Sequence, residues 1–306
     1  MSLSNPSGAS EAQNDVSQSD RDESVHTDAD AKRWAPYLQA ARRVHAAYPL
    51  FDGHNDLPWA VRCGFDMRLS DVDLTADNSS LLVPGIPWGK IHTDLPRLRA
   101  GGVGANFWSV YIPTSLEGPA AIQATLEQID IVHRMCDRYP QHFEMAATAA
   151  DVRRIAAAGK IASVCGIEGG HQIGGSLRCL RMFHALGVRY MTLTHNGGPG
   201  WADPAVEKDG RWASSAPNGG LAPFGGAVVA EMNRLGMVVD LSHVHHETMA
   251  AALDASRAPV MFSHSSTRAL CAHPRDVPDD VLVRLAENRG VVMIVFLSKF
   301  VAGEFW

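Results

Sequence analysis

Seven short apolar runs recur along this 306-residue chain, and stretches with helical periodicity separate them. Most of the runs are almost continuously apolar rather than alternating, which is typical of parallel strands that are covered on both faces. In one intervening stretch, Ile122, Leu126 and Ile129 share a helical face with Val132. Strands that alternate with helices predict a parallel β-sheet. The apolar runs span residues 49–52, 103–112, 161–167, 188–194, 237–241, 259–262 and 291–296.

Two parallel architectures fit this order, an open doubly wound sheet and a closed barrel. A doubly wound sheet usually has a G-x-G-x-x-G turn after its first strand, and none follows Phe51. We therefore expect an α/β fold, a (β/α)8 TIM-type barrel. A closed barrel of this type needs eight strands. The seven runs therefore predict that the eighth strand is missing from the chain.

The chain changes in composition near residue 30. Residues 1–30 are rich in polar and acidic residues and predict a disordered leader. Beyond them, Trp34, Tyr37 and Leu38 begin a helical pattern that precedes the first strand. The predicted domains are thus a leader over 1–30 and a C-terminally incomplete barrel domain over 31–306. Residues 201–220 contain several Gly and Pro residues without periodicity, so we expect a loop over the active site.

Composition and charge exclude several classes of protein. The net charge of −6 argues against a nucleic-acid partner, because phosphate binding needs a basic surface. The five cysteines are scattered without a C-x-x-C pair, which indicates buried thiols in a reducing compartment. No segment has the apolar pattern of a signal peptide or of a membrane span. We expect a cytoplasmic protein without a membrane anchor. The sequence leaves open whether it forms a homodimer.

Side chains that bind metals follow four of the apolar runs. His54 and Asp56 follow the first run, Glu168 the third, His243 the fifth and His264 the sixth. Barrel enzymes place their active sites at the carboxyl ends of the strands, so these residues should converge in space. A single histidine at such a position is more often a hydrogen-bonded residue of the barrel end. Five residues at matching positions favour a metal site.

The chemistry of the five residues fits a pair of divalent ions. In an extended segment His54 and Asp56 point to the same side and can hold one ion together. Glu168 ends a buried run with no adjacent Lys or Arg, so a cation is needed to compensate its charge. A carboxylate can bridge two ions about 3.5–4 Å apart. Imidazoles such as His243 and His264 are common zinc ligands, although Mn²⁺ or Co²⁺ also suits a mixed site.

Two further residues indicate substrate contacts. His195 follows the fourth run and is placed to donate a hydrogen bond to a developing oxyanion. Arg275 lies in the loop after the sixth run, where a guanidinium could hold a carboxylate through paired hydrogen bonds. A solvated loop arginine explains Arg275 equally well. His245 and His246 fall where a helix should begin, and we do not expect them to bind a metal.

Six motifs make the chain resemble the membrane (renal) dipeptidases, peptidase family M19. They occur in order from about residue 45 to the end of the chain. The motifs are residues 51–58 (FDGHNDLP), 166–171 (GIEGGH), 193–196 (LTHN), 239–244 (VDLSHV), 262–266 (FSHSS) and 275–280 (RDVPDD). The resemblance implies a (β/α)8 barrel of the metal-dependent hydrolase kind with two Zn²⁺ ions per chain. It also implies hydrolysis of dipeptides, including those with a C-terminal D-residue, by a metal-activated bridging water.

The resemblance implies a role for each matching residue. Glu168 and His195 would be catalytic, and His195 and Arg275 would contact the dipeptide. The implied assignments are His54 and Asp56 for one zinc, His243 and His264 for the other, Glu168 as the bridge between them, His195 for the tetrahedral intermediate and Arg275 for the free carboxylate of the substrate.

The chain departs from the family pattern near its end. Members of the family continue to an eighth strand, where an aspartate in a Gly-Asp-x-Asp-Gly-like segment handles the proton of the departing amine. The sequence reaches Trp306 without such a segment. One alternative is therefore an inactive or non-catalytic relative that binds a metal or a dipeptide. Another is a different amidohydrolase-type metalloenzyme, although such enzymes would have H-x-H after the first strand and a modified lysine in place of Glu168.

Overall fold

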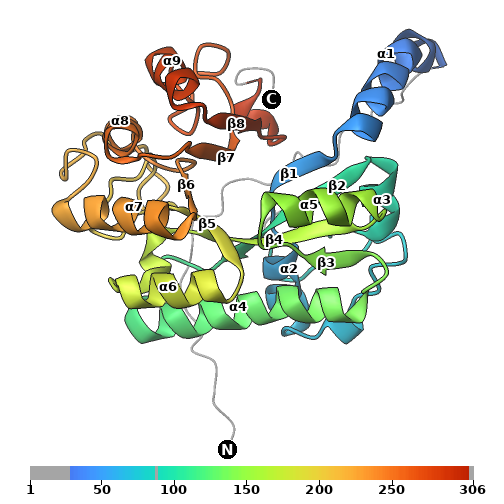
Figure 1. The fold of residues 1–306 in the computed structure, drawn as a ribbon, viewed down its shortest axis with the longest axis horizontal. Coiled ribbons are helices and arrows are strands. Elements are labelled where there is room, and N and C mark those ends of the chain that lie inside the picture. The colour runs from blue at the N-terminus through green and yellow to red at the C-terminus, as the bar shows by residue number, and fades with distance from the viewer. Residues whose placement is uncertain (1–27, 87–88, 303–306) are drawn as a thin grey trace, which may run out of the picture. The chain divides into compact units, whose positions relative to one another are not determined.

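The computed structural model describes residues 28–86 and 89–302, which contain one parallel β-sheet (Figure 1). Within the described residues, neighbouring strands follow the order β1-β2-β4-β5-β6-β7-β8, and β3 pairs with β4 beside this path. The strands are β1 (Leu50–Asn55), β2 (Val103–Tyr111), β3 (Phe143–Met145), β4 (Ile161–Glu168), β5 (Val188–Thr192), β6 (Val238–Asp240), β7 (Met261–Ser265) and β8 (Val291–Ile294).

The strand path confirms the predicted barrel. Its seven strands coincide with the seven apolar runs, and every pair is parallel. The sheet curves into a nearly closed barrel, in which Gly53 of β1 lies against β7. A Cβ atom on Gly53 would come within 2.3 Å of the Ser263 carbonyl oxygen, so only glycine permits this approach. Among the described strands, no hydrogen-bonded ladder joins β8 to β1.

The sequence patterns gave no sign of β3. This strand has three residues, and only Phe143 among them is buried. It pairs with the beginning of β4 over Ile161–Ser163, whereas β5 pairs with β4 from Cys165 onward. An eighth strand is therefore present. It pairs with the first residues of β4, beside the main strand path, and does not lie between β8 and β1. A three-residue strand is too short to produce a recognisable apolar run.

Helices connect the strands, and α6, α7, α8 and α9 pack against one another in succession (Figure 1). Single 3₁₀ turns follow α2, β4 and β8. The α-helices of the barrel unit are α2 (Leu57–Phe65), α3 (Leu95–Ala100), α4 (Gly118–Arg138), α5 (Ala149–Ala157), α6 (Leu177–Ala185), α7 (Pro223–Leu235), α8 (His246–Ala255) and α9 (Asp279–Asn288). The 3₁₀ turns are η1 (Leu69–Asp71), η2 (Gly170–Ile173) and η3 (Ser298–Phe300).

The buried stripe of α4 is shifted from the predicted one. Ile129 and Val132 are buried as expected, but Leu126 is 42% exposed. The stripe instead includes Thr125 and Gln128, which are fully buried. The Thr125 hydroxyl contacts the side chain of Gln172 at 2.9 Å, and the Gln128 amide donates to a backbone carbonyl at 2.8 Å. Because these polar residues form hydrogen bonds in the protein interior, the pattern of apolar residues alone predicted the wrong buried face for α4.

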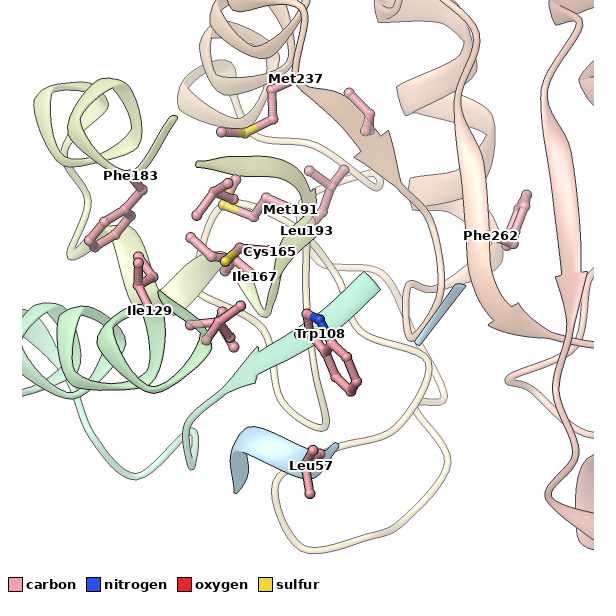
Figure 2. Close-up of a cluster of buried hydrophobic side chains, with 14 of the residues drawn as sticks. Leu57, Trp108, Ile129, Cys165, Ile167, Phe183, Met191, Leu193, Met237 and Phe262 are labelled. Atoms are coloured by element: carbon pink, nitrogen blue, oxygen red, sulfur yellow. The ribbon is translucent and has the colours of Figure 1, made fainter. Parts of the chain in front are cut away.

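The core lies between the strands and the helices that cover them. Figure 2 shows Ile167, Met191 and Leu193 gathered near Ile129 of α4. All eight residues of β4 are buried, which explains its continuous apolar sequence. Trp108 of β2 is fully buried in the same cluster. Burial of each large apolar side chain contributes about 1.5–3 kcal/mol, so this core fixes the strand ends that carry the polar residues.

Residues 193–222 form no helix or strand, which confirms the loop predicted over 201–220. The loop reaches the turn after β6, where Pro204 forms a bridge with Val244. The backbone N–H of Ala205 donates to the carbonyl of His243 at 2.7 Å. This long connection is therefore attached to one of the predicted metal ligands.

Among the described residues, helix α1 (Asp28–Ala47) belongs to one compact unit, and the residues from Pro49 onward belong to another. The helical spacing of its aromatic residues is confirmed, although Trp34 and Tyr37 are 46% and 67% exposed. Residues 1–27 of the predicted leader lie outside the described residues. Among the described helices, none has the length and apolar character needed to cross a bilayer.

Candidate metal centre

Glu168, the last residue of β4, is 4% exposed and lies among four imidazoles. The rings come from β1, from β7 and from the segments just after β5 and β6, as the strand-end argument predicted. After Glu168 the backbone turns at Gly169, whose φ of +117° favours glycine. The distances from Glu168 Oε1 to the four Nε2 atoms are 3.0 Å for His243, 3.3 Å for His264, 3.5 Å for His54 and 3.7 Å for His195.

The end of β1 contributes an imidazole and a carboxylate that point to the same side. His54 Nε2 lies 3.3 Å from Asp56 Oδ1, as the alternate spacing predicted. The other ring nitrogen, Nδ1, lies 3.2 Å from the Tyr190 hydroxyl. Contacts at both nitrogens fix the orientation of the His54 ring. Asp56 is the more open of the pair, with 35% of its side chain exposed.

His243 and His264 present their Nε2 atoms to each other at 3.0 Å. His243 has a φ of +68°, a left-handed conformation that is uncommon for a side chain of this size. Its carbonyl accepts hydrogen bonds from the Thr194 hydroxyl at 3.0 Å and from Ala205 N–H, which hold this backbone in place. Its Nδ1 atom is buried and finds no partner among the described residues. A cation between the two rings would balance their facing lone pairs.

Asp240 and Ser263 support this pair, and sequence reasoning assigned them no role. The fully buried Asp240 carboxylate accepts from the Ser263 hydroxyl at 2.6 Å and from the Thr192 hydroxyl at 2.5 Å. The Ser263 oxygen also lies 2.7 Å from His264 Nδ1. The chain from Asp240 through Ser263 to His264 fixes the ring, as carboxylates behind metal-bound histidines do. The sequence signal that could have identified Asp240 is a carboxylate at the end of an apolar run.

Burial and neighbouring charges shift the pKa values of the residues in this cluster in different directions. Burial raises the pKa of Glu168 to about 7 and lowers that of His195 to about 3. It also lowers the pKa of His243 and of His264 well below the ordinary value. Burial alone would lower the pKa of His54 too, but the charges of Glu168 and a neighbouring carboxylate raise it to about 9. Three of the four rings are thus neutral, the form in which imidazole binds a metal.

The arrangement meets the requirements of a divalent cation. Two groups of three potential ligand atoms, each group lying within 4.8 Å, share the Glu168 carboxylate. Nitrogen and carboxylate oxygen donors of this kind suit zinc and similar ions. Asp56 lies outside both groups, and the pairing of residues with individual ions stays a prediction. The two groups are His54, Glu168 and His264, and Glu168, His195 and His243.

Arg275 lies near the same strand ends and is 3% exposed. Burial lowers its pKa to about 10, so it remains charged at neutral pH. Its guanidinium makes two long contacts, 3.5 Å to the Ser265 hydroxyl and 3.4 Å to the His264 carbonyl. Among the described residues, no carboxylate forms an ion pair with it. The structure thus places Arg275 inside, which excludes the solvated loop arginine, and leaves it without a paired anion.

A family model of membrane dipeptidases, peptidase family M19, matches residues 38–304. The chain belongs to this family. The match confirms the resemblance drawn from the six motifs. Membership supports a metal-dependent dipeptidase as the class of enzyme, and the cluster around Glu168 provides candidate ligands for the metal.

Solved structures show the same fold in other membrane dipeptidase-like proteins. One is a metallopeptidase from Rhodobacter sphaeroides liganded with a phosphinate mimic of the dipeptide L-Ala-D-Ala. It is 26% identical with a TM-score of 0.70, and the match covers 83% of this chain and 75% of that one. The metallopeptidase dipeptidase AC is also 26% identical, with a TM-score of 0.67 and coverage of 82% and 73%.

A third structure, the probable dipeptidase PvdM from Pseudomonas aeruginosa, supports the fold alone. It is 22% identical with a TM-score of 0.72, and the match covers 88% of this chain. The match covers 65% of the PvdM chain.

Proposed function

We propose that this protein hydrolyses dipeptides at a centre of two zinc ions, including dipeptides with a C-terminal D-residue. The observation that carries the proposal is the buried Glu168 carboxylate, whose Oε1 atom has four imidazole nitrogens within 3.7 Å. A buried carboxylate in such surroundings is costly without a cation. The phosphinate mimic of L-Ala-D-Ala bound to the relative from R. sphaeroides supports the substrate class.

In this proposal the protein holds the two ions through the residues that surround Glu168. His54 and Asp56 would bind one ion, His243 and His264 the other, and Glu168 both. When bound, two such ions lower the pKa of a water molecule in the site and polarise the substrate carbonyl. Glu168 keeps its negative charge beside the ions, since nearby positive charge opposes the effect of burial on its pKa.

His195 is the residue proposed to stabilise the tetrahedral intermediate. Because burial holds its pKa at about 3, the ring is neutral and has one N–H to donate. Its ring centre lies 4.3 Å from that of His243 and 4.7 Å from that of Tyr111, so packing limits its rotation. A donor fixed before the reaction stabilises a developing oxyanion without reorganisation.

Arg275 is proposed to bind the free carboxylate of the dipeptide. It is buried and charged, and among the described residues it has no paired anion. A guanidinium can donate two parallel hydrogen bonds to one carboxylate, which orients as well as attracts the substrate. Recognition of the carboxylate at this point limits the reaction to short peptides whose scissile bond reaches the metal centre.

The test is metal analysis combined with a dipeptide panel. We expect two zinc ions per chain by elemental analysis, and hydrolysis of both L-Ala-L-Ala and L-Ala-D-Ala. Removal of the ions by a chelator should abolish hydrolysis, and added zinc should restore it. A protein without bound metal, and with the same heat stability after chelation, would contradict the metal centre. Full metal content without hydrolysis of any dipeptide would contradict the enzymatic function.

A further inference from the structure

Arg275 contacts an aromatic ring on its flat face. The Cζ atom of Arg275 lies 5.1 Å from the centre of the Phe300 ring. Phe300 belongs to η3, after β8, and is 6% exposed. A cation over the face of a ring is held by the ring quadrupole. This contact holds the guanidinium against the ring, while its N–H groups make only long contacts of 3.5 and 3.4 Å and so remain available to a carboxylate.

Phe300 is itself one member of a row of three aromatic rings (the stack), which meet through tilted and edge-to-face contacts. The ring centres of Phe300 and His273 are 4.5 Å apart, and those of His273 and Trp212 are 5.3 Å apart. His273 Nδ1 also accepts a hydrogen bond from the backbone N–H of Arg275 at 3.2 Å. The stack therefore contacts both the backbone and the side chain of this arginine.

The three rings come from three different connections of the barrel. Trp212 lies in the long loop after β5, His273 in the connection after β7, and Phe300 after β8. Trp212 is 60% exposed, and its partner residue in a β-bridge is Val206 of the same loop. The stack thus links the exposed loop to the buried arginine through side chains alone.

We propose that the stack of Trp212, His273 and Phe300 positions the Arg275 guanidinium for the carboxylate of the substrate. The inference rests on the proposed function of Arg275, and it adds the residues that set the geometry of that contact. The two contacts of 3.4 and 3.5 Å to His264 and Ser265 are too long to fix the guanidinium plane. Phe300 supplies the missing constraint.

A purely structural role for Phe300 predicts a different result from a positioning role. Loss of core packing would weaken binding of every ligand and lower the melting temperature. Loss of positioning would weaken only ligands that carry the carboxylate. The charge on the ligand therefore separates the two, and Phe300→Leu and Phe300→Tyr are the informative variants. Leucine retains an apolar side chain without a ring face, whereas tyrosine retains the face.

The experiment measures calorimetric binding to zinc-loaded protein of two probes, the phosphinate mimic of L-Ala-D-Ala and its C-terminal amide. Phe300→Leu should weaken binding of the acid about 5- to 10-fold and leave the amide unchanged. Phe300→Tyr should bind the acid within about twofold of the original protein. Trp212→Ala, at the outer end of the stack, should weaken binding of the acid about twofold.

Lys299→Ala is the matched control. The exposed Lys299 Nζ atom lies 5.2 Å from the centre of the same ring, yet the side chain has no part in the proposed contact, so binding should not change. Equal weakening of the acid and the amide by Phe300→Leu, or no effect on either, would overturn the positioning role. If the original protein binds neither probe when loaded with zinc, the proposed function itself fails.

Discussion

The metal-binding and carboxylate-binding parts of the proposed site are constructed in different ways. The proposed metal ligands lie on strands or within three residues of a strand end. Contacts with the hydroxyls of Ser263 and Tyr190 orient the rings of His264 and His54. Arg275 lies in the connection between β7 and α9, makes two long polar contacts and packs against the Phe300 ring. Register and core packing determine the first part, whereas loops determine the second.

This difference separates the expected effects of substitutions. Changes around Glu168 should act through metal affinity, because the carboxylate lies where the four rings converge. Changes around Arg275 should act through substrate affinity and leave the metal content intact.

Replacement of Glu168 by glutamine should have the largest effect. The side chain keeps its size but loses the charge that the cations require. We expect zinc affinity to fall by more than about 100-fold, because changes to residues behind metal ligands already cost 10–100-fold. Hydrolysis should be lost with the metal. Elemental analysis after dialysis measures the first effect and dipeptide assays the second.

Glu117→Gln provides the control for this variant. It makes the same chemical change at a side chain that is 74% exposed and paired with Lys208. Metal content and activity should stay unchanged. Retention of two zinc ions by Glu168→Gln would show that this carboxylate is not a bridging ligand.

Replacement of Arg275 by lysine should affect the other part of the site. Lysine retains the positive charge but lacks the planar fork that pairs with a carboxylate. We expect the KM for dipeptides with a free carboxylate to rise about 10- to 100-fold, as for loss of a strong hydrogen bond to a charged group. Zinc content should stay at two ions per chain. Arg284→Lys, on α9 and paired with Asp254, should leave KM unchanged. A fall in the metal content of Arg275→Lys would contradict the view that this residue acts on substrate affinity alone.

Replacement of Ser263 by alanine tests the support behind His264. The hydroxyl connects His264 Nδ1 to the Asp240 carboxylate through contacts of 2.7 and 2.6 Å. Its loss should lower zinc affinity by about 10-fold, at the lower end of such effects. KM should not change once zinc is saturating. Competition with a fluorescent zinc chelator measures the affinity, and Ser70→Ala, at an exposed position, serves as the reference.

The sequence located the cluster of proposed metal ligands more readily than the surroundings of Arg275, for a physical reason. Strands recur as apolar runs, so the residues that end them, such as Glu168 and His264, can be located without a structure. The rotation of Arg275 into the interior depends on how loops fold, which no local pattern encodes. The same limit explains why Phe300, in the short 3₁₀ turn η3, was not associated with the site.

Short or polar features of the fold were also missed. β3 has too few residues to show a pattern, and the polar residues Thr125 and Gln128 concealed the buried face of α4. Asp240 was part of a motif but had no predicted role, because its hydrogen bonds to Thr192 and Ser263 join three different strands. Such contacts depend on the register between strands, and one sequence does not reveal that register.

The release of protons on zinc binding should give the smallest but most specific effect. In the metal-free protein His54 has a pKa of about 9, because the charges of Glu168 and Asp56 outweigh the effect of burial. This raised pKa stabilises the metal-free fold below about pH 6.5, and the contribution is lost as the pH rises through 9. Zinc binding requires the neutral ring of His54 and the ionised carboxylate of Glu168. At pH 7 His54 should therefore release about one proton and Glu168, whose pKa is about 7, about half of one.

His195, His243 and His264 are already neutral at pH 7, because burial lowers their pKa values, and should release none. Zinc titrations by calorimetry in buffers of different ionisation enthalpy count the protons. The number should fall between pH 7 and pH 10, and zinc affinity should weaken as the pH drops below 7. Release of no proton from His54 at pH 7 would mean that the ring is neutral before the metal arrives. The carboxylates around it would then not carry the charge that draws the cations to this end of the barrel.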